Sequence, residues 1–442
     1  MMNKEYAFFW GCTIQAKFPF MEKATRLVLE RLNIKFRDID SFTCCPEKSL
    51  VKNIDEPLFD LTGIRNIALA ENANVDIMSV CTGCYSNLKQ IRAKVSSNLP
   101  YQKKLNQTLE NLNLNFSGKS SVYHFIEYLH DEVGLDKIRA NVKYPLKGLN
   151  IAIHYGCHLV RPSHAINFDS PFDPRKYDNI LRALGANVVN YKNKMMCCGQ
   201  ALDRVDEHDK SLVMARIKLD SINESKADAI STVCPSCFTQ FDTNQFMLLK
   251  EGLNRQIPVI TLEELMCLAF GIEGAEDFIS QHKIKAGKFI EKFKAIKALA
   301  DYSAVFDRDS LVRCYNCCAC KNDCPMSLSF ESYDPPLVIK MILDNDVERA
   351  MSSKIVWECL ECHTCVELCP QNYSWETVLT TLKNLAIKND IGPRNVKKAE
   401  EIFFKTLRLG DPQEGMRKKL GLPPVKKTLD PEFKRIIDEN IL

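Results

Sequence analysis

Apolar positions along the first 285 residues alternate between two periodicities. Short apolar runs of strand type lead into cysteine-containing loops, and segments with apolar residues at helical spacing lie between them. This alternation predicts βα units. The strand-type segments are 6–14, 75–87, 151–159 and 227–240, and the clearest amphipathic helices are 19–33 and 212–227.

The last third of the chain has helical periodicity only. Apolar residues recur at helical spacing in 286–306 and again, after a proline start, in 335–353. We therefore expect an all-α domain over 286–395. The polar, lysine-rich tail 396–442 that follows is either a docking arm for a partner or a loosely ordered terminus.

The strand-type segments belong to an internal repeat. Each copy has a Gly-Cys, then a cysteine doublet, then a C-x-x-C, and 35 residues lie between doublet and C-x-x-C in both copies (46–80 and 199–233). The first half of the chain is thus one module present twice, with expected domains at 1–145 and 146–285. The two cysteine sets are Cys12, Cys44, Cys45, Cys81, Cys84 and Cys157, Cys197, Cys198, Cys234, Cys237.

Size, charge and cysteine content narrow the class of protein. The 442 residues suffice for two or three domains, and a formal net charge of +3 gives no sign of nucleic-acid or membrane-surface binding. The N-terminal segment lacks a secretory signal pattern, and no apolar run is long enough to span a bilayer. We therefore expect a soluble cytoplasmic protein, in which 20 cysteines indicate metal binding or redox chemistry rather than disulfides.

Two cysteine runs in the helical domain have the spacing of a pair of [4Fe–4S] cubanes. Each reads C-x-x-C-x-x-C-x-x-x-C-P, in which three cysteines hold one cluster and the fourth crosses to the other. Structural zinc is the alternative. The expected ligand sets are Cys314, Cys317, Cys320, Cys369 and Cys359, Cys362, Cys365, Cys324.

Five cysteines per repeated module are one more than a cubane or a zinc ion needs. Adjacent thiols in the doublets suit different irons of an atypical cluster, and Gly199 would let the backbone approach closely. Two structural zinc sites with a spare thiol each remain the alternative. Cys12, Cys81, Cys157 and Cys234 follow strand-type runs, where open α/β sheets gather their ligands, so two facing modules would enclose a cleft.

The motifs resemble those of the heterodisulfide reductase family. "FFWGCTI", "CCPEKS", "VCTGCYSNL", "IHYGCHLVRPS", "MMCCGQALD" and "VCPSCFTQFD" are similar to the CCG domains of its B subunit, and "VWECLECHTCVELCPQN" is similar to its C subunit. The order suggests a natural fusion of the two subunits. Proline replaces glycine after the first doublet, a departure that is common in the family.

The resemblance implies a mechanism and a substrate. In this family each CCG domain holds a noncubane [4Fe–4S] cluster on its five cysteines, and the disulfide of coenzyme M and coenzyme B is split between two such clusters. Electrons would arrive through the two cubanes. The implied partners are a flavin-containing A subunit and, through it, a hydrogenase or formate dehydrogenase of methanogenesis. No flavin-binding G-x-G-x-x-G follows a strand in this chain, which agrees with a separate flavoprotein.

Several side chains near the cysteines are candidates for other roles. The implied substrate is anionic, so cations in the cysteine loops are candidate substrate ligands, and histidines beside Cys157 are candidate proton donors. Cys318 falls outside the ligand spacing and Cys267 lies on an apolar helix face, so both are expected to be buried side chains and not ligands. The candidate cations are Lys17, Arg161 and Arg204, and the histidines are His154 and His158.

Two functions stay open from the residues alone. One is an enzyme that reduces this heterodisulfide or a different disulfide; the other is an electron-transfer subunit that serves a flavin dehydrogenase. Two intact five-cysteine sets favour the enzyme, because a relay does not need a pair of clusters that face a substrate.

Overall fold

The computed structural model describes residues 4–253, 255–303, 305–344, 346–406, 409–410, 412–425, 432 and 435. The chain forms two compact units, Met1–Lys297 and Ala298–Leu442. The expected limits of the finer domains, at 145/146, 285/286 and 395/396, stay predictions.

The first unit contains two four-stranded parallel sheets with the same strand order. The orders are β2-β1-β3-β4 and β6-β5-β7-β8, so the sequence repeat is also a repeat of the fold, and the α/β prediction is confirmed. The strands are β1 Tyr6–Phe8, β2 Phe36–Arg37, β3 Asp76–Ser79, β4 Val122–His124, β5 Asn150–Ile153, β6 Asn187–Val189, β7 Ala229–Thr232 and β8 Val259–Thr261.

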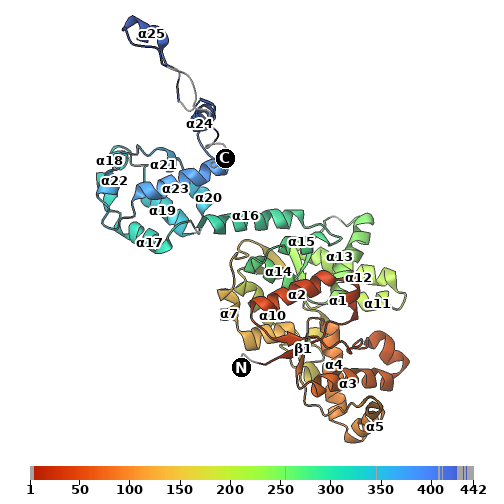
Figure 1. Cartoon of the computed structure of the whole chain (residues 1–442). Coiled ribbons are helices and arrows are strands. Elements are labelled where there is room, and N and C mark those ends of the chain that lie inside the picture. Colours follow the sequence, from red (N-terminus) through yellow and green to blue (C-terminus); the bar gives the residue numbers. More distant parts are fainter. Residues whose placement is uncertain are drawn as a thin grey trace. The chain divides into compact units, whose positions relative to one another are not determined.

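Helices surround both sheets (Figure 1). The central strands β3 and β7 are short and fully buried, as expected for parallel strands covered on both faces. The first module contains α1 Cys12–Lys17, α2 Pro19–Arg31, η1 Lys48–Lys52, α3 Glu56–Asn72, α4 Thr82–Ser96, α5 Leu99–Leu109, η2 Glu110–Leu112, α6 Phe125–Tyr128, η3 Leu129–Val133 and α7 Leu135–Ala140. The second contains α8 Cys157–Val160, α9 Ser163–Ile166, α10 Lys176–Ala183, α11 Gln200–Asp203, α12 His208–Glu224, α13 Pro235–Lys250, α14 Leu262–Phe270 and α15 Ala275–Ser280.

The same local device starts the helix after the last strand of each sheet. His124 caps α6 in a capping box with Glu127, and Thr261 caps α14 in a capping box with Glu264. Such a box satisfies backbone N–H groups that a helix start leaves without partners. Helix α14 of the second module packs on α2 of the first, where the Cys267 thiol lies 3.5 Å from the Ala24 carbonyl oxygen. Cys267 is therefore a fully buried core residue, as predicted.

The second unit is helical. Its core is made by apolar side chains such as Val338, Val356, Trp375 and Leu382. The segment 335–353, expected to be helical, forms two helices, because the Asp-Asn-Asp at 344–346 favours a turn over helix continuation. The helices, with the connecting α16, are α16 Gly287–Ser303, α17 Arg308–Cys317, η4 Ala319–Asp323, α18 Pro325–Ser329, α19 Pro335–Leu343, α20 Val347–Met351, α21 Lys354–Trp357, α22 Thr364–Glu367, α23 Trp375–Lys388, α24 Arg394–Thr406 and α25 Glu414–Lys419.

Two further expectations concern membranes and the tail. Among the described residues, none of the helices combines the length and the apolar character that crossing a membrane requires. The expected tail 396–442 includes most of α24 and all of α25, and its residues from 426 onward, apart from 432 and 435, lie outside the described residues.

Candidate functional site

Ten cysteines of the first unit line one cavity. Four of them, Cys12, Cys81, Cys157 and Cys234, follow strands, as the sequence predicted. The space between these side chains, counted together with its open mouth, is about 890 Å³. The ten are Cys12, Cys44, Cys45, Cys81, Cys84, Cys157, Cys197, Cys198, Cys234 and Cys237.

The first and doublet cysteines approach one another in the same way in both modules. The Sγ atoms of Cys12 and Cys44 are 3.6 Å apart, and those of Cys157 and Cys197 are 3.9 Å apart. The two adjacent cysteines of each doublet differ in how far they are exposed to solvent. Cys44 and Cys197 are half-buried, whereas Cys45 and Cys198 are buried.

Glycines make room for these sulfur atoms. Gly11 has φ +73°, and a Cβ there would lie 2.7 Å from Cys84 Sγ, so a side chain would displace the thiol. Gly199 has φ +91°, and its backbone N–H donates to Cys197 Sγ at 3.4 Å. The backbone at Gly199 thus lies close to a cysteine sulfur; its expected approach to the sulfides of a cluster stays a prediction.

The donor chemistry of the cavity fits an iron–sulfur group. Each module contributes five thiols, and thiolates are the soft ligands that such clusters take. Neutral histidine and carboxylate donors, which would favour other metals, are scarce among the lining residues, where only His158 and Glu47 are of these types.

Arg204 lies at this cavity and is held by an ion pair between the modules. Its guanidinium is 3.0 Å from the Glu47 carboxylate, which belongs to the first module, and it donates to Ser236 Oγ at 2.9 Å. Both Arg204 and Glu47 line the cavity. Sequence reasoning missed Glu47, because no motif marks an acid whose partner is 157 residues further along the chain.

The other two candidate cations lie elsewhere. Lys17 is exposed at the end of α1 and is not among the cavity residues. Arg161 donates to the carbonyl oxygens of Pro171 at 2.9 Å and Met195 at 3.4 Å. Its guanidinium therefore binds backbone groups of this chain. Among the three, the structure brings only Arg204 to the cysteines.

The two candidate histidines occupy different places. His158 lines the cavity, and burial followed by the charge of Lys48 lowers the pKa of its imidazole. His154 is buried beside the sulfur of Cys237, with 3.2 Å between Nε2 and Sγ, and is not a lining residue. Burial holds the pKa of His154 well below its ordinary value, so this imidazole is neutral.

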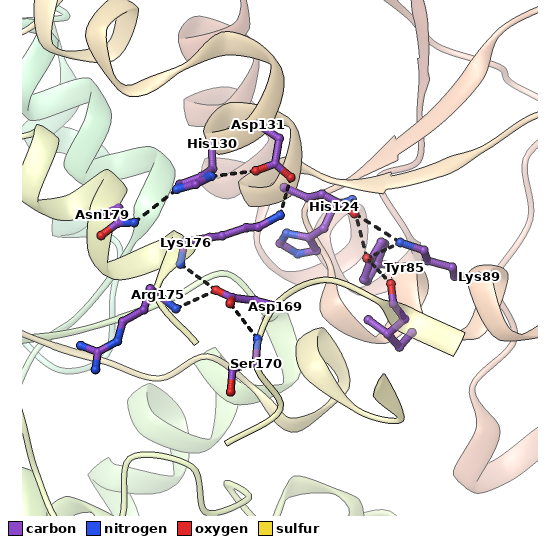
Figure 2. Close-up of polar contacts among 12 residues, drawn as sticks. Tyr85, Lys89, His124, His130, Asp131, Asp169, Ser170, Arg175, Lys176 and Asn179 are labelled. Carbon is purple, nitrogen blue, oxygen red and sulfur yellow. Dashed lines mark hydrogen bonds and ion pairs between the residues drawn. The ribbon is translucent and has the colours of Figure 1, made fainter. Parts of the chain in front are cut away.

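Polar contacts join the two modules (Figure 2). The Tyr85 hydroxyl, on the helix that carries Cys84, lies 3.0 Å from Glu127 Oε2 and 3.4 Å from the carbonyl oxygen of Ile166 in the second module. Lys176 of the second module forms an ion pair with Asp131 of the first. These contacts hold the two cysteine sets around one space.

The second unit brings its cysteines into neighbouring positions. Burial raises the pKa of the Cys314 thiol to about 12, and the next causes are the charges of Cys320 and Cys369. Cys318 is half-buried, and its thiol donates to the Tyr315 carbonyl oxygen at 2.7 Å. A second cavity is lined by Cys320 together with the four cysteines expected for one cubane, Cys324, Cys359, Cys362 and Cys365.

Known proteins with the same modules identify the family. Residues 6–89 and 151–242 match the family model described as a cysteine-rich domain, and 310–373 match a 4Fe-4S dicluster domain. The chain is 35% identical to the B subunit of the ferredoxin:CoB-CoM heterodisulfide reductase of Methanosarcina mazei over 299 residues, 67% of this chain and 99% of that protein. It is also 31% identical to the 8-methylmenaquinol:fumarate reductase membrane anchor subunit of Wolinella succinogenes, over 65% of this chain and 99% of that one.

The last third has a relative of its own. The chain is 36% identical over 81 residues to the C subunit of the ferredoxin:CoB-CoM heterodisulfide reductase of Methanosarcina acetivorans. The matched stretch is 18% of this chain and 32% of that protein. The chain belongs to the heterodisulfide reductase family, as a fusion of a B-type part with a segment of C-subunit type.

Proposed function

We propose that the chain is the catalytic and electron-relay subunit of a heterodisulfide reductase, which reduces the disulfide of coenzyme M and coenzyme B to the two thiols. Its relatives are named as CoB-CoM heterodisulfide reductase subunits, so the chain is a disulfide-reducing iron–sulfur subunit. The convergence of ten cysteines from two modules on one cavity carries the proposal of catalysis. A simple relay would not need two five-cysteine sets around a space for a small molecule.

We assign one noncubane [4Fe–4S] cluster to each five-cysteine set and one cubane to each four-cysteine set of the second unit. When bound, such clusters supply single electrons and iron with an affinity for sulfur. The noncubane sets are Cys12, Cys44, Cys45, Cys81, Cys84 and Cys157, Cys197, Cys198, Cys234, Cys237. The cubane sets are Cys314, Cys317, Cys320, Cys369 and Cys359, Cys362, Cys365, Cys324.

The other residues of the cavity have distinct roles in this proposal. Arg204 binds an anionic group of the substrate, which competes with Glu47 for the guanidinium. His158, at the cavity wall, relays a proton from solvent to a leaving thiolate through its imidazole. His154 keeps its ring against Cys237 and orients that ligand, so it is a positioning residue.

Partners and location follow from the same proposal. Relatives are named as subunits of larger reductases, so this chain has partner subunits. We propose a flavin-containing A subunit that receives electrons from a hydrogenase or formate dehydrogenase. A chain with 20 cysteines, all free in the structure, suits the reducing cytoplasm.

The test is anaerobic purification with counting of iron and acid-labile sulfide, followed by EPR of the oxidised protein with and without coenzyme M thiol. We expect about sixteen irons per chain and a paramagnetic signal that appears only with the thiol. About eight irons with zinc in the first unit would reduce the repeated modules to structural elements and refute catalysis.

One relative supports a second candidate, a subunit that only transfers electrons. The Wolinella succinogenes protein is named as a membrane anchor subunit of a methylmenaquinol:fumarate reductase, although it shares the repeated modules. Turnover of the heterodisulfide with a reduced viologen separates the two functions, because a relay would leave the disulfide intact.

A further inference from the structure

The second module contains a buried lysine with no carboxylate partner. Lys218 on α12 is fully buried, and its Nζ donates to the backbone carbonyl oxygens of Asn193 at 2.9 Å, Lys194 at 3.0 Å and Met196 at 2.6 Å. Three neutral acceptors satisfy the three N–H donors, and the Tyr191 ring lies 5.6 Å from Nζ, but these groups carry no negative charge. Within the described residues, no carboxylate forms an ion pair with it.

The Met196 carbonyl oxygen that accepts from this ammonium directly precedes Cys197, so the charge lies beside the second cysteine set, whose thiolates would be its counter-ions once a cluster is bound. Burial lowers the pKa of Lys218 to about 8, and the charges of Cys237, Cys198, Cys197 and Cys157 oppose that shift. The group is therefore mostly protonated at neutral pH. Because a buried charge is costly unless it is paired, the cysteine set with its bound group is the natural counter-charge.

The first module has no equivalent buried cation. Equal spacing from doublet to C-x-x-C makes residues 153 positions apart equivalent (234 − 81 = 198 − 45 = 153), so Lys218 corresponds to Arg65. Arg65 is partly exposed and donates to the Ser41 carbonyl oxygen at 2.9 Å. The doublet loop of the first module is held instead by the neutral, buried amide of Asn66, which donates to the Cys44 carbonyl oxygen at 3.1 Å.

The second module also has the shorter hydrogen bond from a side chain to a cysteine sulfur. A ligating thiolate can only accept, so the His154 Nε2–H donates to Cys237 over 3.2 Å. Phe9, two residues before the Gly-Cys of the first module, stands at the equivalent place. Phenylalanine has no hydrogen-bond donor in its side chain. In the first module the amide of Asn87 donates instead to the sulfur of another cysteine, Cys45, over a longer distance of 3.6 Å. Donors to the sulfurs and nearby positive charge both stabilise the reduced form of an iron–sulfur cluster.

We propose that Lys218 is the internal counter-ion of the cluster held by the second cysteine set and makes it the more easily reduced of the two noncubane clusters. The inference rests on the proposed function, which assigns a cluster to each set. The step it concerns is addition of one electron, supplied by the ferredoxin-type unit, with no bond formed and no proton moved by Lys218.

The experiment is an anaerobic redox titration of the reconstituted full chain, followed by EPR. Wild type is expected to give two waves from the repeated modules, and C197S, which removes a ligand of the second set, identifies the higher one. K218M is expected to lower that wave by at least about tenfold in the reduction equilibrium, or about 59 mV for one electron, without moving the lower wave. K218Q should behave like K218M, because it also lacks the charge.

Matched variants show whether the effect arises from the charge of Lys218 or from its hydrogen bonds to the backbone. K218R keeps the charge, so its higher wave should stay within about threefold of wild type. R65M, at the equivalent position of the first module, should leave the higher wave in place. If K218M and K218Q lose the iron of the second set alone while K218R and R65M keep it, the counter-ion role is also supported.

Three results overturn the inference. In the first, K218M leaves both waves unmoved or moves only the lower one. In the second, K218R loses iron or potential as K218Q does, which makes the effect one of geometry. In the third, wild type gives no waves from the repeated modules; that result refutes the proposed function as well, and so differs from the other two.

Discussion

The two repeated modules hold their cysteines in the same frame but surround them differently. Both have the same strand order, a glycine before the first cysteine, and a capped helix after the last strand. By contrast, the acid Glu47 and the base Arg204 correspond to Gln200 and Val51 in the other module. Duplication has thus kept the cysteine positions, whereas the neighbouring polar groups have diverged. The two halves of the cavity therefore differ in their polar side chains. Under the proposed function, this difference suits a substrate whose two ends differ in chemistry.

Loss of one ligand should have the largest effect and tests whether both modules are needed. We expect C45S and C198S each to lose about four irons and to reduce disulfide turnover by more than about a thousandfold, because the two sets act on one substrate. Iron counting and a reduced-viologen assay measure this. C267A, at a buried cysteine outside the cavity, should keep the iron. Turnover retained in C45S would mean that one module suffices.

Substitution of the ion pair between the modules should change substrate binding. We expect R204M to raise KM about tenfold, about 1.4 kcal/mol, with kcat within a few-fold of wild type. E47Q should lower KM, since it frees Arg204 for the anionic substrate. Steady-state kinetics at fixed ionic strength measure both, with K23M on the exposed side of α2 as the control. An unchanged KM in R204M would exclude Arg204 from substrate binding.

The neutral amide of the first module should matter for local stability. Asn66 contacts Thr43 N at 2.9 Å, Thr43 Oγ1 at 3.2 Å and the Cys44 carbonyl oxygen at 3.1 Å, so N66A leaves partly buried backbone groups without these partners. We expect a loss of roughly 2 kcal/mol and reduced iron in the first set. Thermal unfolding and iron analysis measure the two effects. N98A removes an exposed helix cap, so it should cost about 1 kcal/mol and no iron.

The smallest effect concerns pH and the carboxylates of the two capping boxes. Glu264 pairs with His282 at 2.9 Å, whereas its equivalent Glu127 pairs with Lys89 at 3.3 Å. Burial opposes charge on His282, but the charges of Glu264 and Asp242 raise its pKa. The stability it contributes is therefore complete below about pH 6.5 and is lost as the pH rises through the folded value.

Thermal unfolding between about pH 6 and pH 9 measures this loss. H282Q should remove the part of the pH dependence that arises in the second module, and K89M should not. An identical decline in H282Q and wild type would assign it to other groups.

Sequence analysis predicted the repeat from its matched cysteine motifs and the all-helical second unit from helical periodicity, because such patterns can be recognised without knowledge of long-range contacts. It also placed Cys12, Cys81, Cys157 and Cys234 after strands, and these cysteines meet at one cavity. Long-range pairings could not be predicted in this way. Lys218 lies in an amphipathic helix, where a lysine usually faces solvent, and only the fold shows that it is buried. Arg161 has the sequence context of a substrate ligand, yet binds two carbonyl oxygens.

Fusion of B-type and C-type segments in one chain has a kinetic consequence under the proposed function. In separate subunits, the frequency of electron delivery depends on how many complexes are assembled. A covalent connection makes that encounter intramolecular, at an effective concentration set by the length and stiffness of the connecting segment. Dilution, or scarcity of one partner, would then not separate the source of electrons from the disulfide site, and the two would be synthesised in a ratio of one to one.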